Sequence, residues 1–179
     1  MTIVHEILQQ MPGLGQPQRK FLATLFVTIL GLRGRVNFRN LSRYCAYAER
    51  TIARQFREPF DWPDCHQRVL RMALDPRSDL VSAHDASFIP KRGKQTFGLG
   101  HFFNGCTSRA ERGLEIATLA VVDVTRRCAL TLAVAQTPPG EQAPKAEPDD
   151  TRVDCYTQHL HEPRHRLPPS ITYHCVDGY

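Results

Sequence analysis

Two strand-like runs joined by a short polar turn dominate the second half of the sequence. GLEIATLAVVDV, residues 113–124, and CALTLAVAQ, residues 128–136, flank Thr125-Arg126-Arg127. Two β-rich runs joined by so few residues predict a β-hairpin. Both faces of the first run are largely apolar, which predicts a strand in the middle of a sheet that is covered on both sides. The second run places small side chains on one predicted face, where a helix could pack closely: Ala129, Thr131, Ala133 and Ala135.

The residues around this hairpin predict the rest of a sheet. DLVSAHDASFI, residues 79–89, reads as a strand that ends at Pro90, and a glycine-rich stretch occupies residues 96–105. Proline and acidic residues at 137–150 predict a flexible connector. Residues 151–162 then predict a helix with Val153, Tyr156 and Leu160 on one side, and residues 170–176 predict a last strand. The expected order is three antiparallel strands, a helix and a fourth strand.

The first 75 residues predict helices. RKFLATLFVTILGL, residues 19–32, is apolar nearly all round and indicates a core helix. Residues 40–45 and 49–56 predict two short helices joined by a turn at 46–48, and residues 65–74 predict a further helix. Leu41, Tyr44, Ile52 and Phe56 should face inward, and Arg43, Arg50, Arg54 and Arg57 should face outward. Asp75-Pro76 marks the boundary between a helical domain over 1–75 and a second domain over 76–179, so the expected fold class is α+β.

The two short helices with outward arginines have the layout of a helix-turn-helix, whose second helix enters the major groove of DNA. Two short packed helices with solvated arginines fit the sequence as well, because the turn lacks a glycine. The charge distribution bears on the same choice. Residues 1–75 carry a net charge of +5, residues 76–140 carry +3 and residues 141–179 carry −3. A basic first half favours a polyanionic partner, most commonly nucleic acid, although a mildly basic surface without a partner has the same composition.

The cysteines and the apolar segments limit the kinds of cross-link, metal site and membrane segment that we expect in this chain. None of the six cysteines lies in a C-x-x-C pair, so we expect isolated buried thiols rather than disulfides or a cysteine zinc site. The most apolar helical stretch, residues 21–32, is too short to span a bilayer. The first ten residues show neither the basic start nor the cleavage site of a signal peptide. We therefore expect a cytoplasmic protein.

Two aspartates suggest a metal site. Asp85 lies within the predicted strand at 79–89, on the side of Val81 and Ala83, and Asp177 follows the last predicted strand. If these strands are neighbours, the two carboxylates meet at one edge of the sheet. Paired carboxylates suit Mg²⁺, which prefers oxygen ligands and keeps places for water and phosphate. Asp123 also ends a strand, but it precedes the hairpin turn and is interpreted as a turn residue.

The segments around these aspartates resemble the DDE transposases of bacterial insertion sequences, whose catalytic domain has a ribonuclease H-like fold. The resemblance is carried by AHDASFIPKRGKQTFGLGHFFNGC at 83–106, RGLEIATLAVVDV at 112–124, YHCVDGY at 173–179, and NFRNLSRYCAYAERTIARQF at 37–56. It covers nearly the whole chain apart from the connector, and it implies an incomplete ribonuclease H-like mixed sheet. It also implies that Asp85 and Asp177 match the first two acidic ligands of the catalytic triad and hold Mg²⁺ or Mn²⁺.

The activity that the resemblance implies is DNA transposition by metal-dependent phosphodiester cleavage and strand transfer. The family's third acidic ligand is a glutamate well beyond the second aspartate, whereas only Gly178 and Tyr179 follow Asp177 here. The chain therefore resembles a transposase truncated after its second catalytic residue, and we expect it to be inactive alone. The alternatives are a DNA-binding fragment that competes with or regulates an intact transposase, and a non-functional remnant. The expected partners are transposon ends, target DNA, and a second copy or an intact transposase.

Other residues give weaker indications of a binding or catalytic role. Lys91, Arg92 and Lys94 follow Asp85 and could hold DNA phosphates, or they could form a solvated basic loop. The histidine cluster at 159, 161 and 165 is interpreted as exposed, without a metal. His84 is next to Asp85 but points to the opposite face of a regular strand, so a general-base role is not assigned. The glycines of residues 96–105 do not match a dinucleotide-binding motif and indicate a turn or bulge.

Overall fold

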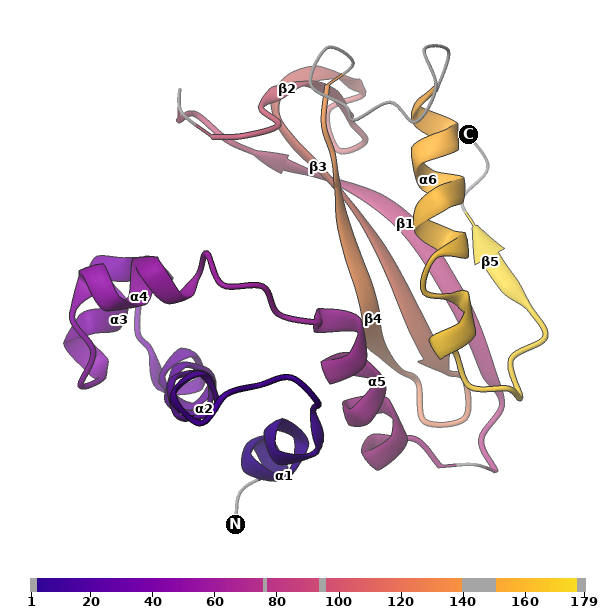
Figure 1. The fold of residues 1–179 in the computed structure, drawn as a ribbon. Coiled ribbons are helices and arrows are strands. Elements are labelled where there is room, and N and C mark those ends of the chain that lie inside the picture. The colour runs from indigo at the N-terminus through magenta and orange to yellow at the C-terminus, as the bar shows by residue number, and fades with distance from the viewer. Residues whose placement is uncertain (1–2, 76, 94–95, 140–150, 177–179) are drawn as a thin grey trace. The chain divides into compact units, whose positions relative to one another are not determined.

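A computed structural model describes residues 3–75, 77–93, 96–139 and 151–176 of the chain (Figure 1). The chain forms two compact units, and the boundary between them lies within one helix, between Val69 and Leu70. Helices make up the first unit, and a five-stranded sheet with accompanying helices makes up the second. The expected α+β class with helices at the N-terminus is confirmed.

In its described residues, the first unit contains four helices and the start of a fifth. They are α1 (Ile3–Gln10), α2 (Gln16–Gly31), α3 (Phe38–Tyr44), α4 (Glu49–Gln55) and α5 (Trp62–Ala73). Pro17 lies in the first turn of α2, where its missing N–H costs no helical hydrogen bond. Asn37 caps α3, because its side-chain oxygen accepts a hydrogen bond from the backbone N–H of Asn40.

The core of the first unit is built around α2 and includes Phe21, Leu41 and Ile52, which is fully buried. The inward positions predicted for Leu41 and Ile52 are therefore correct. Those predicted for Tyr44 and Phe56 are wrong, since each side chain is 49% exposed. The short helices do not supply enough neighbouring surface to bury every apolar residue on the inner face. For the same reason α2 is not buried all round, and its Leu30 is 83% exposed.

The second unit contains strands β1 (Leu80–Pro90), β2 (Gly100–Asn104), β3 (Arg109–Asp123), β4 (Cys128–Thr137) and β5 (His174–Val176). Helix α6 (Arg152–His161) and a 3₁₀ turn (Arg164–Arg166) lie between β4 and β5 in the sequence. The strand order is β2-β3-β1-β5, and β4 also pairs with β3. β1 pairs antiparallel with β3, β3 pairs antiparallel with β4, and β5 pairs parallel with β1. The predicted hairpin and the predicted neighbourhood of the first and last strands are both present.

β3 is the central strand, as its apolar character predicts, but only one of its faces is buried. Leu119 and Val121 on that face are fully buried, whereas residues on the other face are partly exposed. A bulge in the β3–β4 pairing lies between Leu119 and Ala120, so Ala133 pairs with Leu119 and Thr131 pairs with Ala120. The small residues expected on one face of β4 are therefore divided: Ala133 is buried and Thr131 is exposed.

The buried face of the sheet forms the core of the second unit. Leu70 and Leu74, at the end of α5 and just beyond it, pack with Leu119, Val121 and other residues of this face. Leu160 of α6 packs against the same cluster, and Figure 1 shows α6 beside the sheet. Tyr156 is also buried, but Val153 of the same helix is 57% exposed, which corrects one of the three residues predicted for its inner side.

All six cysteines are free, as expected for a chain without disulfides. The prediction that they are buried is correct for Cys65, whereas Cys106, Cys128 and Cys175 are exposed. Burial and the nearby Asp64 carboxylate raise the pKa of the Cys65 thiol to about 11. In the part of the chain that the structure describes, no helix combines the length and apolar character needed to cross a membrane.

Candidate functional site

Asp85 lies in the middle of β1 on the exposed face of the sheet. Alternate residues of the strand differ in burial: Ser82 and His84 are buried, while Val81 and Ala83 are partly exposed and Asp85 is exposed. This alternation follows from the period of two in a β-strand. The hydroxyl of Ser87, two residues further on the same face, donates to Oδ2 of Asp85 at 3.3 Å. The carboxylate is therefore open to solvent and to a ligand.

Asp177 lies outside the described residues, but the strand that leads to it is described. β5 pairs with β1 in a parallel register of Ser82 with His174, Ala83 with Cys175, and His84 with Val176. The last of these pairs consists of the residues that directly precede Asp85 and Asp177 in the sequence. Ser82 Oγ and His174 Nδ1, 2.5 Å apart, add a side-chain hydrogen bond between the two strands. Within the residues that the structure describes, no group of three or more His, Cys, Asp or Glu side chains could hold a metal ion.

Asp123 is the last residue of β3, and its side chain holds the β3–β4 turn, which agrees with its interpretation as a residue that serves the turn. Its side chain is fully buried, and its Oδ1 accepts a hydrogen bond from the backbone N–H of Arg126 at 2.8 Å. The guanidinium of Arg126 also reaches Asp75, with 3.3 Å between Nη2 and Oδ2. These contacts stabilise the turn and leave Asp123 no access to the face that carries Asp85.

His84 points to the buried face of the sheet, opposite Asp85, as its strand position predicted. Its Nε2 lies 3.1 Å from Nδ1 of His159 on α6, and both residues are buried. Burial lowers the pKa of His84, and the Asp85 carboxylate opposes this shift. Burial, together with repulsion from His84, also lowers the pKa of His159, against the attraction of Glu162. Both rings are therefore most stable in the neutral form, in which one donates and the other accepts.

The buried position of His159 corrects the prediction of an exposed histidine cluster, although His161 and His165 are exposed. Its Nε2 is buried without a hydrogen-bond partner in the structure. The period of the helix carried a signal that could have placed His159 correctly, because the residue follows Tyr156 by three positions and therefore shares its face.

Glu115 of β3 is a second polar residue on the buried face. Its Oε1 accepts a hydrogen bond from the Tyr156 hydroxyl at 2.5 Å and lies 3.7 Å from Nε of Arg152. The guanidinium of Arg152 also lies over the Phe102 ring, 5.2 Å from its centroid. The histidine pair and this carboxylate connect α6 to β1 and β3 by polar contacts. They explain how the helix is held on the buried face of the sheet, opposite the face that carries Asp85.

The basic residues after β1 lie further from Asp85 than their sequence suggests. Lys91 and Arg92 are exposed, and Lys94 lies outside the described residues. β1 stays extended to Pro90, so a rise of about 3.3 Å per residue puts Lys91 roughly 20 Å from Asp85 along the strand. Lys91 and Arg92 therefore start well away from the Asp85 carboxylate.

The helices predicted as a helix-turn-helix are both present. α3 begins earlier than predicted, at Phe38, while α4 begins at Glu49 as expected. Arg43, Arg50 and Arg54 are all exposed, and within the described part of the chain none of them forms an ion pair. The two helices thus present cations without acidic partners.

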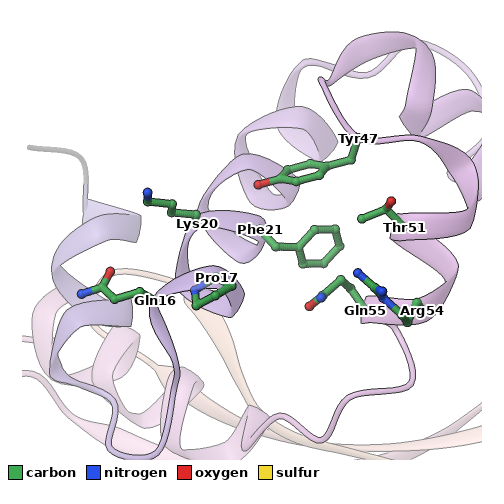
Figure 2. Close-up of a pocket in the computed structure, with 8 residues that line it drawn as sticks. All are labelled: Gln16, Pro17, Lys20, Phe21, Tyr47, Thr51, Arg54 and Gln55. Atoms are coloured by element: carbon green, nitrogen blue, oxygen red, sulfur yellow. The ribbon is translucent and has the colours of Figure 1, made fainter.

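A cavity of about 390 Å³ lies beside Arg54. Figure 2 shows the Phe21 side chain among the lining residues, which come from α2, the α3–α4 turn and α4. The rings of Phe21 and Tyr47 meet edge to face, with 5.3 Å between their centroids. Lys20 and Arg54 also line this cavity, and the side-chain oxygen of Gln55 is buried without a hydrogen-bond partner. Arg54 therefore stands at the rim of a partly apolar cavity.

No protein-family model matches the sequence, and no curated protein is similar to it.

Proposed function

We propose that the second unit belongs to a DNA-processing domain of the DDE transposase type, in which Asp85 and Asp177 together bind Mg²⁺ or Mn²⁺. One observation carries this proposal. The parallel register of β1 and β5 pairs His84 with Val176, the residues immediately before the two aspartates. If the register continues by one residue, the two carboxylates become neighbours on the open face of the sheet, where Asp85 is exposed.

The chemistry of the donors fits a hard divalent cation. Carboxylate oxygens are the ligands that Mg²⁺ prefers, and two of them leave coordination places for water and a phosphate oxygen. When bound, such an ion would polarise a phosphodiester and stabilise its leaving oxygen. The resemblance implies a third acidic ligand beside Asp85 and Asp177. We therefore propose that these two aspartates bind the cation and that cleavage of DNA requires the third ligand as well.

Binding of Mn²⁺ to the 179-residue protein, measured by electron paramagnetic resonance, tests the metal site. Asp85→Asn and Asp177→Asn should each weaken binding at least tenfold. Asp79→Asn is a matched control, because Asp79 is an exposed aspartate just before β1, and it should leave binding unchanged. Equal affinities in all four proteins would show that the two aspartates do not form a metal site. Incubation with Mg²⁺ and duplex DNA should produce no strand cleavage, and cleavage that requires Asp85 would contradict the expected inactivity.

A non-catalytic role in DNA binding is the second candidate, and the unpaired cations of α3 and α4 favour it. In this role the first unit binds transposon ends and competes with, or associates with, an intact transposase in the cytoplasm. DNA binding that survives Asp85→Asn and Asp177→Asn, without any bound metal, would favour this function over the first. Failure of the 179-residue protein to shift duplex DNA in a gel at low salt would exclude it.

A further inference from the structure

Four arginines line one surface depression of about 500 Å³ in the first unit. Arg33 and Arg35 lie in the loop between α2 and α3, while Arg39 and Arg43 lie on α3. Residues four apart share one face of a helix, so the two α3 side chains start from the same side. All four residues are exposed. We call this set the arginine depression.

Hydrogen bonds hold the loop of the arginine depression against α3. Nδ2 of Asn40 donates to the carbonyl oxygens of both Arg33 and Arg35, at 3.0 Å each. Gly34, between them, has a φ of 91°, in the left-handed region that glycine adopts without strain. The two loop arginines are therefore positioned before any ligand arrives, so little backbone order has to be gained on binding.

The arginine depression has a positive charge that the described residues do not neutralise. No aspartate or glutamate lines it, and none of its four arginines takes part in an ion pair in the described ranges. Side chains of like charge at this density repel one another, and a bound anion relieves the repulsion. Guanidinium groups bind phosphate and carboxylate with two parallel hydrogen bonds each, so the arginine depression suits an anion that has paired oxygens, such as a phosphate.

We infer that the arginine depression is a docking site for the phosphodiester backbone of duplex DNA. The inference rests on the DNA-binding part of the proposed function and is independent of the metal site. Four guanidinium groups divided between a loop and a helix exceed what one phosphate can engage, so a row of phosphates fits better than a free anion. In a helix-turn-helix the first helix crosses the backbone and the second reads bases. The arginine depression thus positions the DNA, and Arg50 and Arg54 on α4 are left for the groove.

Salt-dependent affinity for a labelled 20-base-pair duplex, measured by fluorescence anisotropy with the 179-residue protein, tests this assignment. Each phosphate neutralised adds about 0.9 to the steepness of log K against log salt. Arg39→Ala/Arg43→Ala should therefore reduce the slope by about 1.8, which is roughly a 60-fold loss of affinity near 0.1 M salt. Arg33→Ala/Arg35→Ala should have a similar effect. The control is Arg77→Ala/Arg164→Ala, two exposed arginines of the second unit, which makes the same change in net charge.

The outcomes separate this inference from the proposed function. Loss of slope in both arginine-depression variants, with the control unchanged, supports the inference. If both variants bind DNA with the wild-type slope, or if the control loses as much slope as they do, the inference is overturned. The proposed DNA binding then remains intact. Absence of wild-type binding overturns both. Inorganic phosphate that displaces the duplex at concentrations too low to change the ionic strength would assign the arginine depression to a free anion instead. Circular dichroism of each variant checks that the fold is kept.

Discussion

Replacing Tyr156 by phenylalanine should destabilise the second unit by about 2 kcal/mol, since a hydrogen bond to a charged group contributes roughly 1.5–3 kcal/mol. The Tyr156 hydroxyl donates to Glu115 Oε1 at 2.5 Å, and both residues are buried. Phenylalanine keeps the ring and removes only the donor. The Glu115 carboxylate then keeps Arg152 at 3.7 Å, a longer contact made by a side chain that is 47% exposed. Arg152 therefore offsets little of the free energy that is lost with the Tyr156 hydrogen bond.

Urea unfolding monitored by far-ultraviolet circular dichroism measures this loss. With a denaturant slope of about 2 kcal/mol per M, a loss of 2 kcal/mol lowers the midpoint by about 1 M. Trp62, the one tryptophan in the sequence, lies in the first unit, so its fluorescence reports on that unit separately. Tyr173→Phe makes the same chemical change at a side chain that is 72% exposed, and it should change the free energy of unfolding by less than about 0.5 kcal/mol.

A double-mutant cycle with Glu115→Gln tests the reasoning itself. In that background the acceptor is neutral, and Tyr156→Phe should cost only about 0.5–1.5 kcal/mol. An equal cost in both backgrounds would refute the argument, because it would show that the charge of Glu115 does not strengthen the hydrogen bond. A midpoint for Tyr156→Phe that coincides with that of Tyr173→Phe would also refute it.

Three further changes test other parts of the structure. Folding lowers the pKa values of His84 and His159, so below about pH 6.5 the unfolded state binds more protons than the folded state. The contribution of the two histidines to stability is therefore complete above this pH and declines as the pH falls. If the urea midpoint declines equally in His159→Gln, the histidine pair is not the origin of the decline. Gly113→Ala should lower the free energy of unfolding by about 1–3 kcal/mol, because a Cβ there meets the Ile89 carbonyl oxygen and the Phe88 ring. Gly105→Ala is the control, because a Cβ there meets nothing within 4 Å. Similar urea midpoints for the two variants would exclude the steric explanation. Ile52→Ala should lower the stability reported by Trp62 fluorescence by about 2–5 kcal/mol, since Ile52 is fully buried. Val27→Ala, at a side chain that is 56% exposed, should have little effect. A small loss of stability for Ile52→Ala would mean that the core of the first unit repacks and fills the cavity.

Much of the sheet could be predicted because alternation and turn length are local signals. The hairpin at β3 and β4 follows from two β-rich runs, and the buried face of β1 follows from its period of two. β2 was missed because its five residues, which begin with Gly100 in a glycine-rich stretch, are too few to show a period. The bulge in the β3–β4 pairing was missed because it depends on how β4 meets its neighbour, which the residues of β4 alone do not encode.

The polar residues of the core could not be predicted from residue type. Glutamate and histidine are usually exposed, so Glu115 and His159 gave no sign that tertiary packing buries them with partners from another element. Conversely, Tyr44 and Phe56 look like core residues, yet the number of neighbours available to two short helices leaves them half exposed. The strand period placed Asp85 on the side of Val81 and Ala83, but only the burial of Ser82 and His84 shows that this side is the open face.

The pairing pattern of the sheet also determines the order in which its strands can assemble. Asp123 pairs with Cys128 only five residues later, and Leu80 pairs with Asp123 across 43 residues, whereas Ser82 and His174 are 92 residues apart. The entropy lost on closing a loop grows with its length, so the hairpin should form first and β5 should join last. Within the described residues, β5 contributes three residues and lies at one edge of the sheet. Slow hydrogen exchange should therefore be found at β3 and fast exchange at β5, the strand that leads to Asp177.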